Sequence, residues 1–185
     1  MEILSDKLEK ENLFLVLSNA ADLRDKNIEI VKTVTESGYY TIVITSNQPY
    51  SVLKKSYEKE QINTDSIFFI DIITKYALGN IGEEYSNCNF LNTPGDLTNI
   101  GIAINNVLAT ISGEKACIIF DSISAMLIYI SPTSLARFLH YITNKLRLLE
   151  IKGIFLAVNK GLDPEFQVQL TTFVDTVITP DNSEK

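Results

Sequence analysis

Several polar side chains stand directly after short apolar stretches of the chain, where they could bind a small molecule or a nucleotide. These residues are Ser18, Asn19, Ser46, Asn47, Asp71, Asp121, Ser122 and Asn159. If the apolar stretches form parallel strands, the polar side chains meet at the carboxyl edge of the sheet, where such folds bind ligands. Polar residues also occur at strand ends because those ends are solvated, so both interpretations stay open.

Other catalytic arrangements lack essential parts. His140 is the only histidine and no Gly-x-Ser-x-Gly motif accompanies it, which argues against a serine hydrolase. We expect its imidazole to be packed or half-buried on a helix.

Asp71 and Lys160 resemble the aspartate and lysine of a phospho-accepting receiver domain. However, Ser18 and Asn19 stand where a receiver needs an acidic pair to hold magnesium.

The composition predicts a single globular cytoplasmic domain. The 185 residues suffice for one sizeable core, 45% of them are hydrophobic, and neither a membrane-spanning run nor a secretory leader is apparent. The 16 basic and 23 acidic side chains give a net charge of −7, which disfavours nucleic acid and anionic lipid. Cys88, in a polar loop, and Cys117, in an apolar run, have no second thiol or histidine at ligand spacing, so we expect no metal site.

Short apolar stretches alternate with amphipathic segments, a pattern typical of a parallel sheet covered by helices on both faces. The predicted strands are residues 12–17, 40–45, 66–70, 116–120, 153–158 and 176–179. Apolar residues with a period of 3.6 predict helices over residues 22–37, 49–60, 96–112 and 132–150. Ser131 and Asp163 each precede a proline, and we expect both to cap the first turn of a helix.

Two segments depart from this alternation. Residues 75–96 are rich in glycine and asparagine and predict an irregular excursion with a short strand near 89–91. The polar residues 181–185 predict a frayed tail. The core of the single domain is therefore expected over about residues 12–179.

The most distinctive segment, residues 117–126, reads Cys-Ile-Ile-Phe-Asp-Ser-Ile-Ser-Ala-Met, an apolar run closed by an aspartate and followed by Ser-x-Ser. Residues 44–50 read Ile-Thr-Ser-Asn-Gln-Pro-Tyr, residues 92–98 read Asn-Thr-Pro-Gly-Asp-Leu-Thr, and residues 138–147 read Phe-Leu-His-Tyr-Ile-Thr-Asn-Lys-Leu-Arg. Together these segments resemble the KaiC-like branch of the RecA superfamily of ATPases, particularly its archaeal members. The resemblance implies a three-layer α/β domain of the P-loop NTPase superfamily, with a mainly parallel central sheet flanked by helices.

The resemblance also exposes a missing phosphate-binding loop. Such a loop needs glycines, a lysine and a hydroxyl between the first strand and the first helix. Here residues 17–26 read Leu-Ser-Asn-Ala-Ala-Asp-Leu-Arg-Asp-Lys, without a glycine. We expect the carboxylates of Asp22 and Asp25 to cap the helix and to repel a triphosphate.

Two further positions matter for catalysis in the family. Asp121 matches the aspartate that holds the magnesium water shell beside the nucleotide. In the family, a glutamate after the second strand orients the attacking water. Residues 45–49 contain no carboxylate, and Gln48 stands at the matching place instead. The sequence therefore predicts a domain without ATPase activity and without catalytic residues.

These observations favour a non-hydrolysing KaiC/RecA-like module that acts by protein–protein contact in regulation or signal transduction. Its expected partners are a second copy or an active KaiC-like ATPase. No cofactor or metal is expected; the vestigial nucleotide-site candidates for ATP or ADP are Ser18, Asn19, Gln48, Asp121 and Ser122, with Asp121 the candidate for magnesium. The alternative is a small-molecule or nucleotide-binding protein, or an enzyme, with an altered site at the carboxyl ends of the strands.

Overall fold

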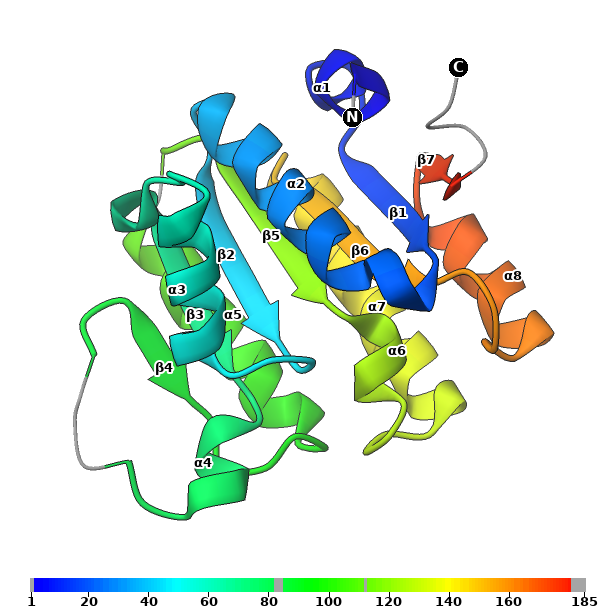
Figure 1. Ribbon diagram of the computed structural model, residues 1–185. Helices are drawn as coiled ribbons and strands as arrows, with labels where there is room; N and C mark the ends of the chain where they lie inside the picture. Colours follow the sequence, from blue (N-terminus) through cyan, green and yellow to red (C-terminus); the bar gives the residue numbers. More distant parts are fainter. Residues whose placement is uncertain (1, 82–84, 112, 181–185) are drawn as a thin grey trace.

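A seven-stranded sheet forms the centre of the computed structural model, which describes residues 2–81, 85–111 and 113–180 (Figure 1). The predicted tail at residues 181–185 lies outside the described residues. The strand order is β4-β3-β2-β5-β6-β1-β7, and every pairing between neighbouring strands is parallel. The strands are β1 (Leu13–Ser18), β2 (Tyr40–Thr45), β3 (Ile67–Asp71), β4 (Cys88–Phe90), β5 (Ala116–Asp121), β6 (Lys152–Val158) and β7 (Thr176–Ile178).

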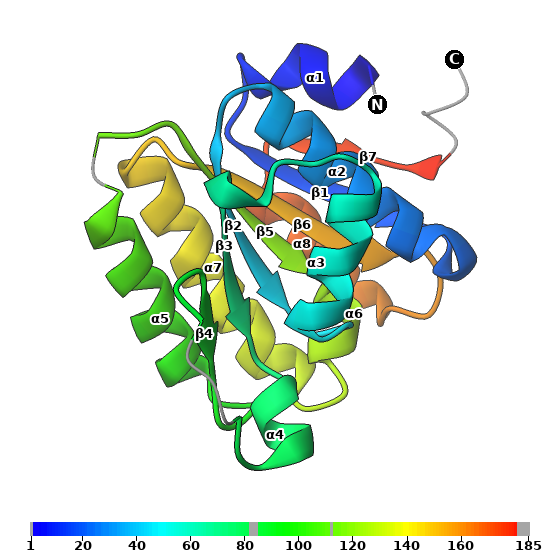
Figure 2. The ribbon, with the colours of Figure 1, turned by 60° about the vertical axis from the view of Figure 1, so that its left-hand side comes forward.

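Helices cover both faces of this sheet. They are α1 (Glu2–Leu8), α2 (Leu23–Glu36), α3 (Tyr50–Lys59), α4 (Thr74–Leu78), α5 (Leu97–Thr110), α6 (Ile123–Met126), α7 (Pro132–Leu148) and α8 (Pro164–Phe173), with short 3-10 turns at Ala20–Asp22 and Thr64–Ser66. Helices α1, α2 and α3 lie on one face, and α5, α7 and α8 lie on the other, as Figure 2 shows from the side. The three-layer α/β fold predicted from the sequence is confirmed, with a sheet that is parallel throughout its named strands.

The side chains of each central strand alternate between two cores. In β1, Leu13, Leu15 and Leu17 belong to the core beneath α5, α7 and α8. Phe14 and Val16 belong to the core beneath α1, α2 and α3. Because both faces are buried, the strands read as continuous apolar runs in the sequence, which is what made them recognisable.

The predicted elements are found with small shifts at their ends. Strands β1, β3 and β5 end one residue later than predicted, on Ser18, Asp71 and Asp121, and all three of these polar residues are buried. The caps predicted at Ser131 and Asp163 are confirmed, since the Ser131 hydroxyl accepts from the Ser134 N–H and the Asp163 carboxylate accepts from the Phe166 N–H. The short helices α1, α4 and α6 were not predicted, because one or two turns carry too little apolar periodicity. Within the described residues, no helix is long and apolar enough to cross a bilayer.

Candidate functional site

The carboxyl ends of the parallel strands share one edge of the sheet and bring the predicted polar residues together. Backbone hydrogen bonds tie these ends to one another. The N–H groups of Ser46 and Asn47, after β2, donate to the Asp121 carbonyl at the end of β5, at 2.7 and 3.2 Å. The Asn159 N–H, after β6, donates to the Ser18 carbonyl at the end of β1, at 2.7 Å. These amides are therefore already paired within the protein.

Asp121 is enclosed by the fold. Its side chain is 2% exposed and follows Cys117 and Ile119 along β5, which face the core beneath α2 and α3. Its carboxylate oxygen Oδ1 is buried and has no hydrogen-bond partner within the described part of the chain. Desolvation by this burial raises the pKa of the Asp121 carboxyl to about 7. Near neutral pH the group is thus partly protonated.

Further polar side chains are buried on the same side of the sheet. The Tyr57 hydroxyl, from α3, donates to Oδ1 of Asn27, from α2, at 2.7 Å. Burial, and secondarily the charge of Asp121, raise the pKa of Tyr57 well above its ordinary value. Nδ2 of Asn27 and Oε1 of Gln48 are buried without a partner among the described residues. Oδ1 of Asp121 and Oδ1 of Asn105, on α5, are also buried without a partner among the described residues, a feature the sequence did not reveal.

The turn between β1 and α2 is held by its own side chains. The Ser18 hydroxyl donates to the Asn19 carbonyl at 3.1 Å, and Nδ2 of Asn19 donates to Oδ2 of Asp22 at 3.2 Å. The prediction that Asp22 caps α2 is wrong, because its side chain accepts no backbone N–H there. Asp22 has helical dihedral angles (φ −100°, ψ −1°), whereas a capping side chain needs an extended backbone.

A cavity of about 310 Å³ opens beside this turn, between β1, α2 and the end of β7. Its lining includes the carboxylates of Asp22, Asp25 and Glu29, together with the ammonium of Lys26. Lys26 forms an ion pair of 2.6 Å with Glu29. The cavity is consequently acidic in balance and poorly suited to an anion.

Asp71 has a different role from the one suggested by a receiver domain. It is fully buried at the end of β3, where Oδ2 accepts from the Tyr50 N–H at 2.8 Å. Oδ1 accepts from the N–H groups of Ile73 and Thr74, at 2.9 and 2.8 Å, and the Thr74 hydroxyl donates to Oδ2. One carboxylate therefore holds the starts of α3 and α4 against the sheet.

The two serines that flank the ends of β2 and β5 also have structural partners. The Ser46 hydroxyl contacts the carbonyl oxygens of Asp121 and Ser122 at 3.1 and 2.9 Å. The Ser122 hydroxyl accepts from the Ala125 N–H at 3.3 Å and so caps α6. Both hydroxyls stabilise the strand ends rather than facing solvent.

Two sequence expectations away from this edge are corrected. The His140 side chain is exposed, not half-buried, in a groove of about 390 Å³ between α7 and α8, with its ring 5.2 Å from that of Phe173. Cys88 is buried in β4 rather than placed in a polar loop, and burial raises the pKa of its thiol, as it does for Cys117. Among the described residues, no three His, Cys, Asp or Glu side chains gather as a metal site would require.

Two solved structures are similar to this fold. One is an uncharacterized protein, PH0321, from Pyrococcus horikoshii, which was solved in complex with an unknown peptide. Its TM-score is 0.71 at 13% sequence identity, and the match covers 97% of this chain and 82% of that chain. The other is the KaiC-like protein PH0186 from the hyperthermophilic archaeon Pyrococcus horikoshii OT3, with a TM-score of 0.63, 13% identity, and coverage of 91% and 70%. These likenesses support a KaiC/RecA-like fold.

A comparison with curated proteins finds no match. The sequence of residues 12–180 matches a family of unknown function, DUF7504. The match covers most of the chain, including every strand of the sheet. The protein therefore belongs to the DUF7504 family.

Proposed function

We propose that this protein is a non-hydrolysing KaiC/RecA-like module that acts through protein–protein contact in regulation or signal transduction. The observation that carries the proposal is the burial of Asp121, the residue that the sequence resemblance aligns with a magnesium-holding aspartate. A magnesium ion needs an ionised carboxylate that it can reach together with its water shell. A carboxyl that is 2% exposed is closed to the ion and its water shell, and a pKa raised to about 7 leaves it only partly ionised near neutral pH.

The turn between β1 and α2 supports the same proposal. Phosphate binding at this place needs several free backbone N–H groups that converge on the anion. The turn has no glycine, and the N–H group of Asn159, after the neighbouring strand β6, already donates to the Ser18 carbonyl. Asp22 and Asp25 add negative charge beside the start of α2. The residues present therefore do not fit a nucleotide with its magnesium.

Contact with another protein is the role that this fold can keep without a nucleotide. The similar protein PH0321 is described as a complex with an unknown peptide, which supports a partner-binding role for this fold. In the proposal the partner is a second copy of the chain or an active KaiC-like ATPase. The exposed apolar side chains at the carboxyl edge of the sheet provide a surface for such contact.

A phosphate-release assay with magnesium and ATP tests the absence of hydrolysis. We expect the rate with purified protein to equal the rate without protein, because the turn after β1 has no glycine to form a phosphate cradle and Gln48 stands where the family has its water-orienting glutamate. Hydrolysis that disappears in Asp121→Ala or Gln48→Ala would contradict the proposal. Activity that persists unchanged in both variants would come from a contaminating ATPase, so the variants serve as controls.

The second candidate is a protein that binds a nucleotide or another small molecule without a phosphate loop. The observation that favours it is that Oδ1 of Asp121, Oε1 of Gln48, Nδ2 of Asn27 and Oδ1 of Asn105 are buried without a partner among the described residues. Leaving such atoms unpaired costs free energy, and a ligand could satisfy them. Calorimetric titration with ATP–magnesium and ADP–magnesium distinguishes the candidates, because micromolar affinity that is lost in Asp121→Ala supports the second one.

A further inference from the structure

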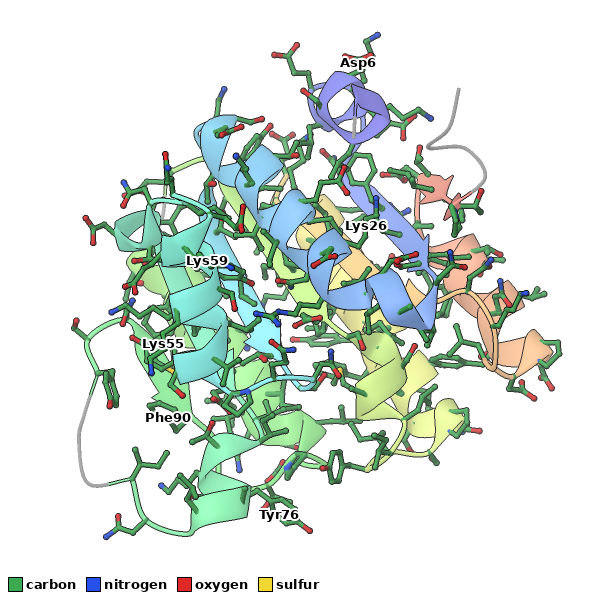
Figure 3. All side chains as sticks on the ribbon, viewed as in Figure 1. Asp6, Lys26, Lys55, Lys59, Tyr76 and Phe90 are labelled. Carbon is green, nitrogen blue, oxygen red and sulfur yellow. The ribbon has the colours of Figure 1, made fainter. Side chains whose placement is uncertain are left out.

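Strand β4 lies at one end of the sheet, so only one of its two sides pairs with another strand. Two backbone hydrogen bonds of 2.8 Å join residues 87 and 91, which flank β4, to β3. Because successive residues of a strand direct their backbone groups to opposite sides, Asn89 also faces β3. The backbone groups of Cys88 and Phe90 therefore face the outer side. Figure 3 shows Phe90 at this end of the sheet.

The outer side of β4 keeps backbone groups available for a further strand. The Cys88 N–H donates to the Tyr85 carbonyl at 3.4 Å, a long hydrogen bond within the preceding turn. The Cys88 carbonyl and the N–H and carbonyl of Phe90 face a side on which no strand of the described residues pairs. Such an edge can accept an extended segment of another chain, whose backbone continues the ladder.

The two ends of the sheet differ in how well they are protected, although each end strand has three residues. Proteins commonly block open edges with charged side chains or proline. At β7, Lys7 and Glu11 contact the Thr176 side chain, and Pro180 follows the strand by two residues. Around β4, residues 85–93 contain neither a charged side chain nor a proline. The β4 edge is therefore the less protected one.

A cavity of about 500 Å³ borders β4. It is lined by the three residues of this strand, by Phe68 of β3, by Lys75 of α4, and by loop residues that include Asn80 and Tyr85. A strand added to β4 would direct every second side chain to one face of the sheet. Pockets beside an open edge select among such side chains, while the backbone pairing itself is blind to sequence. The β4 edge thus combines both parts of a peptide-binding site.

The charges beside this edge favour an acidic peptide. Lys75 is the only charged residue of the described cavity lining, and it has no ion pair within the described part of the chain. Nζ of Lys54, from α3, lies 5.9 Å from the centre of the Tyr50 ring. That ring meets the Phe90 ring edge to face, with centroids 5.8 Å apart. The nearest carboxylate oxygen to Lys54 belongs to Glu58, at 4.0 Å. Two lysines from different helices therefore flank the edge.

We propose that the outer edge of β4 binds an extended acidic segment of a partner protein as an additional strand of the sheet. The inference rests on the proposed function, because it names the surface and the chemistry of the partner. The segment pairs its backbone with Cys88 and Phe90, places one side chain in the cavity, and directs a carboxylate to Lys75 or Lys54. Edge-to-edge pairing of two copies is disfavoured, since it would bring these lysines toward their own counterparts.

A displayed library of random octapeptides, selected on the full-length protein, tests the proposal. We expect it to enrich peptides in which acidic residues alternate with apolar ones. A synthetic member should bind with a dissociation constant on the order of 10 μM in fluorescence anisotropy, because the edge offers few backbone groups.

Two substitutions of one residue isolate the backbone contact. Phe90→Pro and Phe90→Leu both remove the ring, but only proline removes the outward N–H, and proline is tolerated at the open side of an edge strand. The dissociation constant should be at least about tenfold higher for Phe90→Pro than for Phe90→Leu. Circular dichroism verifies that each variant is folded.

A charge reversal tests the lysine contact. Lys75→Glu should raise the dissociation constant by about tenfold, because it places like charge beside the acidic peptide. The matched control is Lys160→Glu, at an exposed position after β6, which should leave the constant within about twofold of the wild-type value.

The absence of any enriched sequence would overturn the proposal, as would equal affinities of the selected peptide for Phe90→Pro and Phe90→Leu. A concentration-dependent dimer that Phe90→Pro dissociates would assign the edge to a second copy and so overturn it too. The proposal and the proposed function fail in different measurements. A protein that neither binds these peptides nor hydrolyses ATP removes only the peptide site, whereas Asp121-dependent hydrolysis in a protein that binds them removes only the non-hydrolysing role.

Discussion

Asp121→Asn is expected to raise the free energy of unfolding by about 4 kcal/mol at about pH 8, with little effect at about pH 4. Burial raises the pKa of this carboxyl from an ordinary value of 3.8 to about 7 in the folded protein. The folded state therefore holds its proton more tightly than the unfolded chain does. The stability that this proton brings is complete below about pH 4 and is lost as the pH rises to about 7. Asparagine has no proton to lose, so the variant avoids this loss.

Urea unfolding of both proteins between these pH values provides the measurement, because the difference between them isolates Asp121 from all other titrating groups. Asp65→Asn, at an exposed position in the turn before β3, is the matched control and should keep the wild-type pH dependence. A wild-type stability that rises steadily from about pH 4 to 7 in parallel with Asp121→Asn would show that Asp121 is ionised and solvated throughout.

Asp71→Ala is expected to lower the free energy of unfolding by about 4 kcal/mol, since three backbone N–H groups and one hydroxyl lose their acceptor at once. The N–H groups of Tyr50, Ile73 and Thr74 all donate to this fully buried carboxylate. Their loss detaches the starts of α3 and α4 together. Because small domains are stable by only about 5–15 kcal/mol, the urea midpoint should fall by a large fraction of its wild-type value.

A second capping aspartate provides the comparison for Asp71. Asp163, at the start of α8, is exposed and accepts from one backbone N–H, that of Phe166 at 2.9 Å. Asp163→Ala should therefore lower stability by only about 1 kcal/mol. Equal losses in the two alanine variants would show that the buried hydrogen bonds of Asp71 contribute nothing beyond an ordinary cap.

The fold could be predicted from the sequence because the central strands are buried on both faces. Runs such as Ile118 to Phe120 are apolar without interruption, and the helices between them carry a clear period of 3.6. The strand ends were less accessible to prediction. Ser18, Asp71 and Asp121 read as loop residues, but strand pairing continues through them and the helices above bury them.

The site was only partly predictable, for the same reason. Parallel strands imply a shared carboxyl edge, so the meeting of Ser46 with Asp121 and Ser122 follows from the strand pattern. The spacing of Asp71 and Thr74 is a signal for a local cap, since aspartate often accepts the N–H three residues later. The bond between Asp71 and the Tyr50 N–H spans two elements and has no such signal. The exposure of His140 has no sequence signal either, because it depends on how α8 packs against α7.

The pH titration of the Asp121 carboxyl carbon by NMR tests the central claim most directly. The signal is assigned by its absence in Asp121→Asn, and the titration is run with and without magnesium and ATP. We predict a midpoint near pH 7 that magnesium and ATP leave unchanged, because the carboxyl is closed off from both. A midpoint near the ordinary value of 3.8, or one that moves downward when magnesium and ATP are added, would contradict the account.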